Sequence, residues 1–351
     1  MVKTWDVVII GGGVIGLSLA VELRRAGISV MVLEKHQPGR EASWAAGGMI
    51  ADREAGTNAL FRLMAQASAA MYPEFAHRLR DESGIDADLR SQGTIRFLDD
   101  DHQPDPPGTP LTTDDLRRLE PELEYSAPAT FLPELCVDPR LLIDALTGTA
   151  KHLGVDMASG SEVTDVEIVE GRAVAATTTK SRYPAAVIVN CAGAWAGQVG
   201  PLKIPTIPVK GQMLAVVPAV VKHVVRGNGV YLIPRSKGRL VIGATVEDAG
   251  FDKRVEPETI HRMHQAAAIL VPRLGQARIL EDWAGLRPAT PDKLPIMGAT
   301  SIAGYFISTG HYRDGIMLAP LTAKLMAQLI RGEKTEIDFE EWSMGRFETH
   351  G

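Results

Sequence analysis

The sequence predicts a mixed α/β (α+β) protein in which a parallel βαβ unit is combined with a second domain built on an antiparallel sheet. Two observations predict this fold class. A strand, a glycine-rich turn, a helix and a second strand follow one another within residues 5–34, and β-branched runs separated by turns fill residues 205–245. With 351 residues, of which 45% are hydrophobic, the chain can bury the cores of about two domains.

The first region has the order of a Rossmann-type unit. Trp5–Ile10 and Ser29–Leu33 are each predicted as a strand. Between them, apolar residues recur at helical spacing from Val14, which predicts a helix to Ala26 that Gly27 terminates. Parallel strands joined by a helix in this way form a right-handed crossover.

Helix caps and a proline-rich segment mark the middle of the chain. The segment Asp101–Pro110 contains four prolines and one glycine, and it is predicted as a loop or a hairpin tip. Thr112 and Asp115 have the spacing of a capping box, which predicts a short helix. Asp138 followed by Pro139 predicts the start of another helix, which we expect to pack on the N-terminal unit.

The antiparallel sheet is predicted from residue 205 onward. Its strands, with Ser236–Gly238 as the turn between the last two, are Val209–Val217, Gly229–Pro234 and Leu240–Thr245. Pro257–Leu270 carries apolar residues on one face and is predicted as a helix. A closing helix is predicted for Pro320–Ile330, before Gly332.

The composition excludes several classes of function. A net charge of −6 without long Lys/Arg runs argues against a nucleic-acid partner. Two cysteines, Cys136 and Cys191, are too few for a disulfide framework or a Cys-based metal site, so no metal is expected. Glycines interrupt the apolar stretch Val7–Val21, which argues against a signal peptide, and no apolar run is long enough for a membrane helix. We therefore expect a cytoplasmic protein without a membrane partner.

A GxGxxG pattern, formed by Gly11, Gly13 and Gly16, lies between the predicted strand and helix. In this context the first glycine permits the turn, the second lets the backbone approach a pyrophosphate, and the third lets helix and strand pack closely. Glu34 ends the second strand, where a carboxylate accepts hydrogen bonds from ribose hydroxyls. The pattern predicts a dinucleotide cofactor but does not separate NAD from FAD.

Further segments resemble those of one family. They are Ser43–Met49, Val187–Trp195, Pro208–Gln212, Tyr231 within the sequence YLIPR, Trp283–Pro288 and Gly310–Ile316. Together they are similar to the D-amino-acid oxidase superfamily of FAD enzymes, and within it to the glycine oxidases associated with thiamine thiazole synthesis. The resemblance extends over nearly the whole chain.

The resemblance implies FAD as the cofactor. Because the covalent members of the family attach flavin through a cysteine near the arginine motif, and no cysteine follows Cys191 here, the FAD is expected to be noncovalent. The residues implied to bind it are Gly11, Gly13, Val14, Ile15, Gly16, Glu34, Lys35, Ser43, Ala46, Gly47, Met49, Val163, Cys191, Ala192, Gly193, Trp195, Arg287, His311, Tyr312, Arg313, Asp314, Gly315 and Ile316.

The resemblance also makes Tyr231, Arg287 and Arg313 the candidate catalytic residues. Arg287 and Tyr231 would hold a substrate carboxylate so that its Cα–H faces flavin N5. Arg313 would line the pocket entrance, or its neighbours Gly310 and Gly315 would matter more, as backbone donors near the flavin. Hydride transfer would leave an imine, which water hydrolyses to the oxo acid and ammonia or an amine, while oxygen takes the electrons and forms hydrogen peroxide. His311 is expected to be structural rather than an acid or base.

Glycine is the first expected substrate. This chain has Val246 where the family carries methionine on the substrate side, so sarcosine, an N-alkylated glycine or D-alanine would also fit. Three alternatives stay open: a flavin dehydrogenase with a quinone or protein acceptor, an NAD(P)-dependent dehydrogenase, and a flavin-binding protein without turnover.

We expect an FAD-binding domain of residues 1–75, 140–200 and 285–351, and a substrate domain of residues 76–139 and 201–284. The active site is expected between them. The family resemblance further implies a homo-oligomer.

Overall fold

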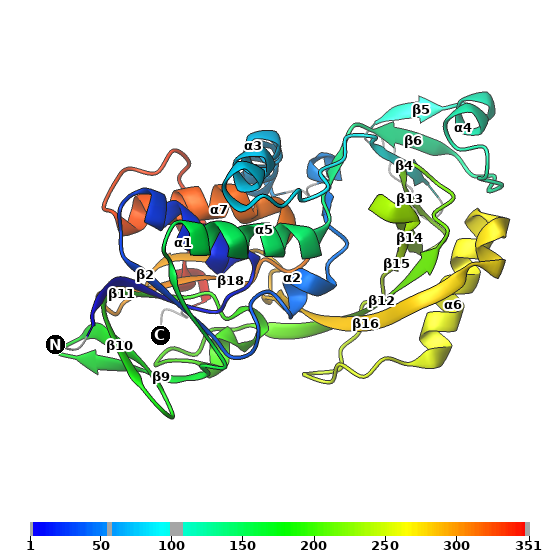
Figure 1. The fold of residues 1–351 in the computed structure, drawn as a ribbon. Coiled ribbons are helices and arrows are strands. Elements are labelled where there is room, and N and C mark those ends of the chain that lie inside the picture. The colour runs from blue at the N-terminus through cyan, green and yellow to red at the C-terminus, as the bar shows by residue number, and fades with distance from the viewer. Residues whose placement is uncertain (1–2, 55–57, 99–107, 348–351) are drawn as a thin grey trace.

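The computed structural model describes residues 3–54, 58–98 and 108–347, and it contains two eight-stranded sheets (Figure 1). The first sheet has the order β17-β18-β11-β1-β2-β8. In addition, β10 pairs antiparallel with β11, and β9 pairs antiparallel with β10. Its strands are β1 (Trp5–Ile10), β2 (Val30–Glu34), β8 (Asp156–Ser159), β9 (Val163–Val169), β10 (Arg172–Thr178), β11 (Arg182–Asn190), β17 (Ile296–Ala299) and β18 (Tyr305–Thr309). The pairs among β18, β11, β1, β2 and β8 are parallel, as a βαβ unit requires.

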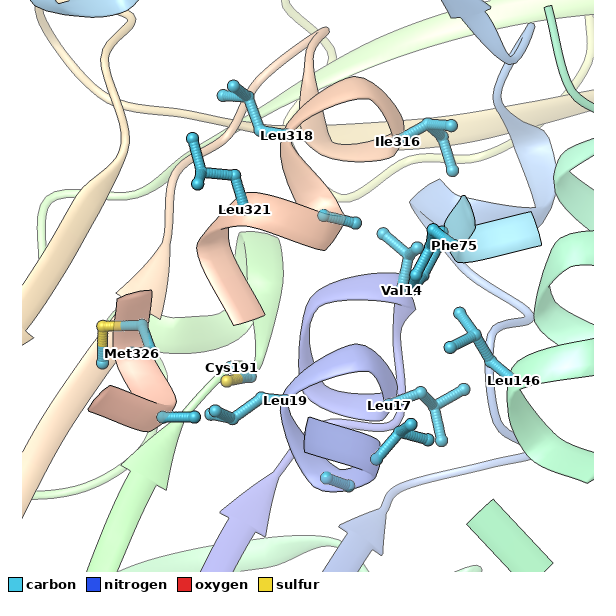
Figure 2. Close-up of a cluster of buried hydrophobic side chains, with 14 of the residues drawn as sticks. Val14, Leu17, Leu19, Phe75, Leu146, Cys191, Ile316, Leu318, Leu321 and Met326 are labelled. Atoms are coloured by element: carbon cyan, nitrogen blue, oxygen red, sulfur yellow. The ribbon is translucent and has the colours of Figure 1, made fainter. Parts of the chain in front are cut away.

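Both faces of this sheet are buried. Val7 and Ile9 of β1 pack under helices, whereas Val8 and Ile10 pack against the β9–β10 side. The covering helices are α1 (Val14–Arg25), α3 (Ala59–Ser83), α5 (Pro139–His152) and α7 (Gly315–Ile330). Figure 2 shows their side chains meeting in one apolar cluster, with Leu17, Leu146 and Leu321 among the members.

The second sheet has the order β16-β12-β15-β14-β13-β4-β6-β5. Its strands are β4 (Thr94–Phe97), β5 (Thr109–Leu111), β6 (Ala129–Leu132), β12 (Ile207–Val217), β13 (Val224–Gly227), β14 (Val230–Pro234), β15 (Leu240–Gly243) and β16 (Arg278–Ala289). All pairs are antiparallel except β4–β13. Helix α6 (Pro257–Leu270) buries Ile260 and Met263 against this sheet, and α4 (Thr113–Leu119) lies beside β5. Separately, β3 (Met49–Ile50) pairs with β7 (Leu135–Cys136) in a two-stranded sheet.

Most local predictions are confirmed. Strand β1 and helix α6 have the predicted bounds, and Thr112 and Asp115 form the capping box. Asp138 caps α5 by accepting from the N–H groups of Arg140 and Leu141, and α5 packs against α1. These features depend on neighbours within a few residues, which is why the sequence identified them.

The predicted start of the closing helix was wrong. Helix α7 begins at Gly315 rather than Pro320, so the proline lies inside it. Proline has no N–H for the carbonyl of Ile316, and the hydroxyl of the buried Tyr72 donates to that carbonyl instead. The hydroxyl of Ser68 similarly donates to the Met317 carbonyl at 2.7 Å. Side chains of α3 therefore replace the hydrogen bonding that Pro320 disrupts.

Several other predicted bounds need small adjustments. Strand β15 ends at Gly243, two residues before the predicted end at Thr245. Of the predicted loop Asp101–Pro110, residues 101–107 lie outside the described residues, and Thr109 and Pro110 belong to the edge strand β5. No described helix is long and apolar enough to cross a membrane.

Candidate active site

The glycine pattern forms a tight turn between β1 and α1. Gly11 has a φ of +103°, and a Cβ atom there would lie 2.5 Å from the carbonyl oxygen of Cys191. A Cβ on Gly16 would lie 2.1 Å from the carbonyl oxygen of Gly11. Gly13 has an ordinary φ of −75°, caps α1 and borders a large cavity. The N-terminus of α1 therefore opens onto the cavity, where its dipole can stabilise phosphate groups.

Glu34 is held rigidly beside this turn. Its carboxylate accepts hydrogen bonds from the N–H of Gly12 at 2.8 Å and from the N–H of His36 at 2.9 Å. Each carboxylate oxygen can accept more than one hydrogen bond, so capacity remains for ribose hydroxyls. The neighbouring Lys35 lines the same cavity and forms an exposed ion pair with Glu162 at 2.7 Å.

The segment 42–49 lies directly over the helix N-terminus. It begins with a short helix, α2 (Ala42–Ala45), and the hydroxyl of Ser43 accepts from the N–H of Val14 at 2.9 Å. On its other side, the indole N–H of Trp283 donates to the carbonyl of Ala45 at 3.2 Å. A Cβ on Gly285 would lie 2.4 Å from the Cβ of Ala45. Small residues therefore let β16 and α2 approach closely.

The segment 191–195 continues from the end of β11. The Cys191 N–H donates to the carbonyl of Ile10 at 2.8 Å, which places the segment against the glycine turn. The buried Asn190 fixes its course by donating to the carbonyl of Ala196 at 3.0 Å and accepting from the N–H of Ala192 at 3.1 Å. Burial raises the pKa of the Cys191 thiol. The sequence pattern did not assign a role to Asn190, although a polar residue at the end of a buried strand is a visible signal.

A cavity of about 1400 Å³ brings the predicted site residues together. Every one of them lines this cavity except Gly16, which packs against the backbone of Gly11 within the turn. The lining residues come from both sheets, and the volume exceeds the roughly 300–1000 Å³ of ordinary small-molecule pockets. Lining residues that the sequence did not identify include Gly211, Phe251 and Lys253.

Arg287 lies on β16 at the face of the second sheet. Its Nη1 donates to the carbonyl of Thr245 at 2.9 Å and to that of Lys210 at 3.3 Å. Gly211 leaves the space for it, since a Cβ there would lie 2.4 Å from both Nη atoms. Burial and the charge of nearby Arg313 lower the pKa of Arg287.

Arg287 and Arg313 therefore place two positive charges near one another in the lining of the cavity. Among the described residues, neither Arg287 nor Arg313 forms an ion pair with a carboxylate. Tyr231 on β14 lies close enough to affect Arg287 electrostatically. An anion in the cavity would offset the repulsion, and a carboxylate matches the planar guanidinium geometry.

The segment 311–316 connects β18 to α7. His311 is buried, its Nε2 lies 3.2 Å from the Thr322 hydroxyl, and burial lowers its pKa to about 3. Such a histidine is neutral at physiological pH. Asp314 occupies the N-cap position of α7 without a side-chain cap hydrogen bond, and it lines the cavity. Burial raises its pKa to about 6, and the charge of Arg313 opposes that shift. Val246, the residue expected on the substrate side, also lines the cavity and is 53% exposed.

These features fit an FAD molecule. Gly11 and Gly16 form a turn that no larger residue could adopt, and the cavity extends from this turn to the second sheet. A βαβ unit whose glycine turn opens onto such a cavity defines the class of dinucleotide-binding proteins.

The family model for FAD dependent oxidoreductases (DAO) matches residues 6–329. The chain belongs to this family and is therefore an FAD-dependent oxidoreductase, which decides the question between FAD and NAD. Glycine oxidase of Geobacillus kaustophilus is 34% identical over 99% of this chain and 98% of its own length. A crystal structure of glycine oxidase from that organism superposes with a TM-score of 0.93 at 33% identity, covering 98% of this chain and 99% of the other.

The bifunctional protein ThiO/ThiG of Trichormus variabilis is 35% identical over 98% of this chain. The chain spans 55% of the length of that relative. The similarity therefore concerns one part of the bifunctional protein.

Proposed function

We propose that this FAD enzyme oxidises the amine of glycine or of a small related amino acid, such as sarcosine, another N-alkylated glycine or D-alanine, with oxygen as the electron acceptor. The observation that carries the proposal is the pair Arg287 and Arg313, which face the cavity without a carboxylate partner among the described residues. The names of the glycine oxidase relatives support the same substrate class.

The chain's own residues would bind and orient the substrate. Arg287 pairs with its carboxylate, and the Tyr231 hydroxyl donates a further hydrogen bond. The two backbone carbonyls that hold Arg287 Nη1 leave its other N–H groups for the substrate. Arg313 adds positive charge that favours the amino acid anion. Val246 and Phe251 are exposed apolar residues in the lining of the cavity, and a bound substrate would cover part of their surface.

Bound FAD supplies the acceptor for the two electrons of the Cα–H bond. Loss of a hydride from Cα and a proton from nitrogen leaves a C=N bond in the product. Water adds to this bond and releases the oxo acid and ammonia, or the amine from an N-alkylated substrate. Oxygen, with the two electrons and two protons, becomes hydrogen peroxide.

We further propose that the cavity-lining residues predicted from the sequence hold the FAD noncovalently, and that the active site lies between two domains. Because β16 stays in the second sheet as far as Ala289, we propose that the last segment of the FAD-binding domain starts after this strand rather than at residue 285. Because α3 runs unbroken to Ser83, we propose that the first segment of the FAD-binding domain extends to the end of this helix rather than to residue 75. A homo-oligomer remains part of the proposal.

The visible spectrum of the purified protein tests the proposal. Under anaerobic conditions, the yellow flavin should bleach on addition of glycine, sarcosine or D-alanine, and air should restore it with release of hydrogen peroxide. Bleaching without recovery in air would indicate that the enzyme passes its electrons to an acceptor other than oxygen. A spectrum unchanged by all three amines would contradict the proposed substrate class.

A further inference from the structure

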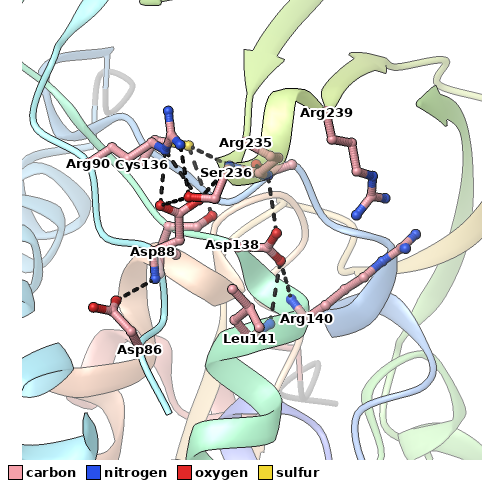
Figure 3. Close-up of polar contacts among 12 residues, drawn as sticks. Asp86, Asp88, Arg90, Cys136, Asp138, Arg140, Leu141, Arg235, Ser236 and Arg239 are labelled. Carbon is pink, nitrogen blue, oxygen red and sulfur yellow. Dashed lines mark hydrogen bonds and ion pairs between the residues drawn. The ribbon is translucent and has the colours of Figure 1, made fainter. Parts of the chain in front are cut away.

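Arg235 lies where three parts of the chain meet. It follows strand β14, and its side chain is 3% exposed. Figure 3 shows it extending from the hairpin formed by β14 and β15 toward Cys136 and Asp138. Its Nη1 lies 3.1 Å from the Cys136 sulfur, its Nε lies 3.7 Å from Asp138 Oδ2, and its Nη2 donates to the carbonyl of Gly47. One guanidinium therefore binds β7, the cap of α5 and the segment 46–49.

Two residues of β14 and Arg235, just after it, have related contacts. Side chains alternate along a strand, so residues 231, 233 and 235 point to one side. Tyr231 lines the cavity, and a Cβ on Gly47 would lie 2.8 Å from Cδ1 of Ile233. Arg235 binds the carbonyl of the same glycine. The strand that presents Tyr231 is thus attached to the segment 46–49 at two neighbouring points.

The segment 46–49 is also restrained from the other side. Gly48 has a φ of +72°, and its carbonyl accepts from the N–H of Val137 at 2.9 Å. A Cβ on Gly48 would lie 2.1 Å from the carbonyl oxygen of Val137. The carboxylate that faces Arg235, Asp138, caps α5 by accepting from Arg140 N–H at 2.9 Å. Arg235 therefore completes a ring of contacts around a cavity-lining loop.

We propose that Arg235 is a positioning residue, which fixes the segment 46–49 to strand β14 and so sets the position of the FAD relative to the Tyr231 hydroxyl. The part that concerns Tyr231 rests on the proposed function, whereas the part that concerns FAD needs only the family's cofactor. Arginine suits this place because its guanidinium spreads five N–H donors over three nitrogens in a fixed plane, whereas the three donors of a lysine ammonium share one nitrogen.

The test is Arg235→Lys in the full-length holoenzyme, with Arg239→Lys as the matched control. Arg239 lies on the same hairpin but pairs with Glu281 instead of the segment 46–49. Losing a charge-assisted hydrogen bond to Gly47 should raise the Kd for FAD by about tenfold or more, measured by flavin fluorescence. At saturating FAD, kcat/KM for the amine should fall about tenfold, while the control stays within about twofold of wild type in both measurements.

A purely structural role would give a different result. In that case Arg235→Lys would lower Tm but leave the FAD Kd and kcat/KM within about twofold of wild type, and the inference would be overturned. If the variant does not fold, Asp138→Asn replaces it, since asparagine caps helices as well as aspartate does. A severalfold rise in FAD Kd is then expected, and an unchanged Kd would contradict the inference. Wild-type protein that binds FAD but oxidises no amine would defeat the proposed function alone, because the Kd comparison would still apply.

Discussion

The two walls of the cavity are built in different ways. The wall at the glycine turn comes mainly from one local stretch, Gly11 to Glu34, whose contacts join residues close in sequence. The opposite wall joins Tyr231, Thr245 and Arg287 with Gly211, which lie on or next to separate strands of the second sheet. The comparison teaches that the proposed cofactor site depends on backbone shape, whereas the proposed substrate site depends on side chains that sheet pairing brings together.

The largest expected effect is on the cofactor wall. Gly13→Val should abolish retention of FAD, because the added side chain would project toward the pyrophosphate. Valine can adopt the φ of −75° found at Gly13, so the expected loss comes from the side chain and not from backbone strain. The absorbance ratio of flavin to protein after gel filtration measures this, with Ala26→Val, at the exposed end of α1, as control. A fully yellow Gly13→Val protein would show that the cofactor does not approach this glycine.

On the substrate wall, Arg287→Ala should lower kcat/KM roughly 10- to 150-fold while FAD stays bound. The expected loss is that of a charge-assisted pairing, about 1.5–3 kcal/mol. Steady-state kinetics with the best amine measure it, and Arg278→Ala on the exposed start of the same strand is the control. Kinetics equal to wild type would remove Arg287 from the carboxylate site.

Asp314 lines the cavity beside Arg313, and its raised pKa predicts a pH effect. Because its pKa is about 6 in the folded protein instead of 3.8, the folded state keeps a proton that the unfolded chain has lost. The free energy of unfolding therefore falls as pH rises through this window and stays lower above it. Asp314→Asn should remove the penalty, so that its stability relative to wild type rises by about 2 kcal/mol between pH 4 and pH 7.

Urea denaturation of both proteins at the two pH values measures this difference. Parallel profiles for variant and wild type would mean that Asp314 has an ordinary pKa in the fold.

The smallest effect concerns the space around Arg287. Gly211→Ala places a Cβ 2.4 Å from the guanidinium, so Arg287 must shift. We expect kcat/KM to fall about tenfold with FAD binding unchanged, because misplacement of a binding group weakens orientation of the substrate. Gly275→Ala, whose Cβ would meet only Ala268 at 3.6 Å, is the control. If Gly211→Ala behaves like this control, the glycine does not position the arginine.

The sequence by itself determined the features that depend on neighbouring residues. It identified the glycine turn, Glu34, the Asp138 cap and part of each sheet, namely β1, β2, β12, β14 and β15, because spacing and local hydrogen bonding specify them. It also identified the candidate residues Tyr231 and Arg287, through resemblance to a family, but not how they come together.

The tertiary structure decided what depends on contacts between distant segments. Helix α7 starts before Pro320 because Tyr72, on another helix, satisfies the carbonyl that the proline leaves free. Gly211 matters because sheet pairing places it beside the guanidinium of Arg287, and Arg235 reaches Gly47 across the junction of the two sheets. No local pattern encodes such contacts, since they arise only when side chains far apart in the sequence are packed within a few ångströms of one another.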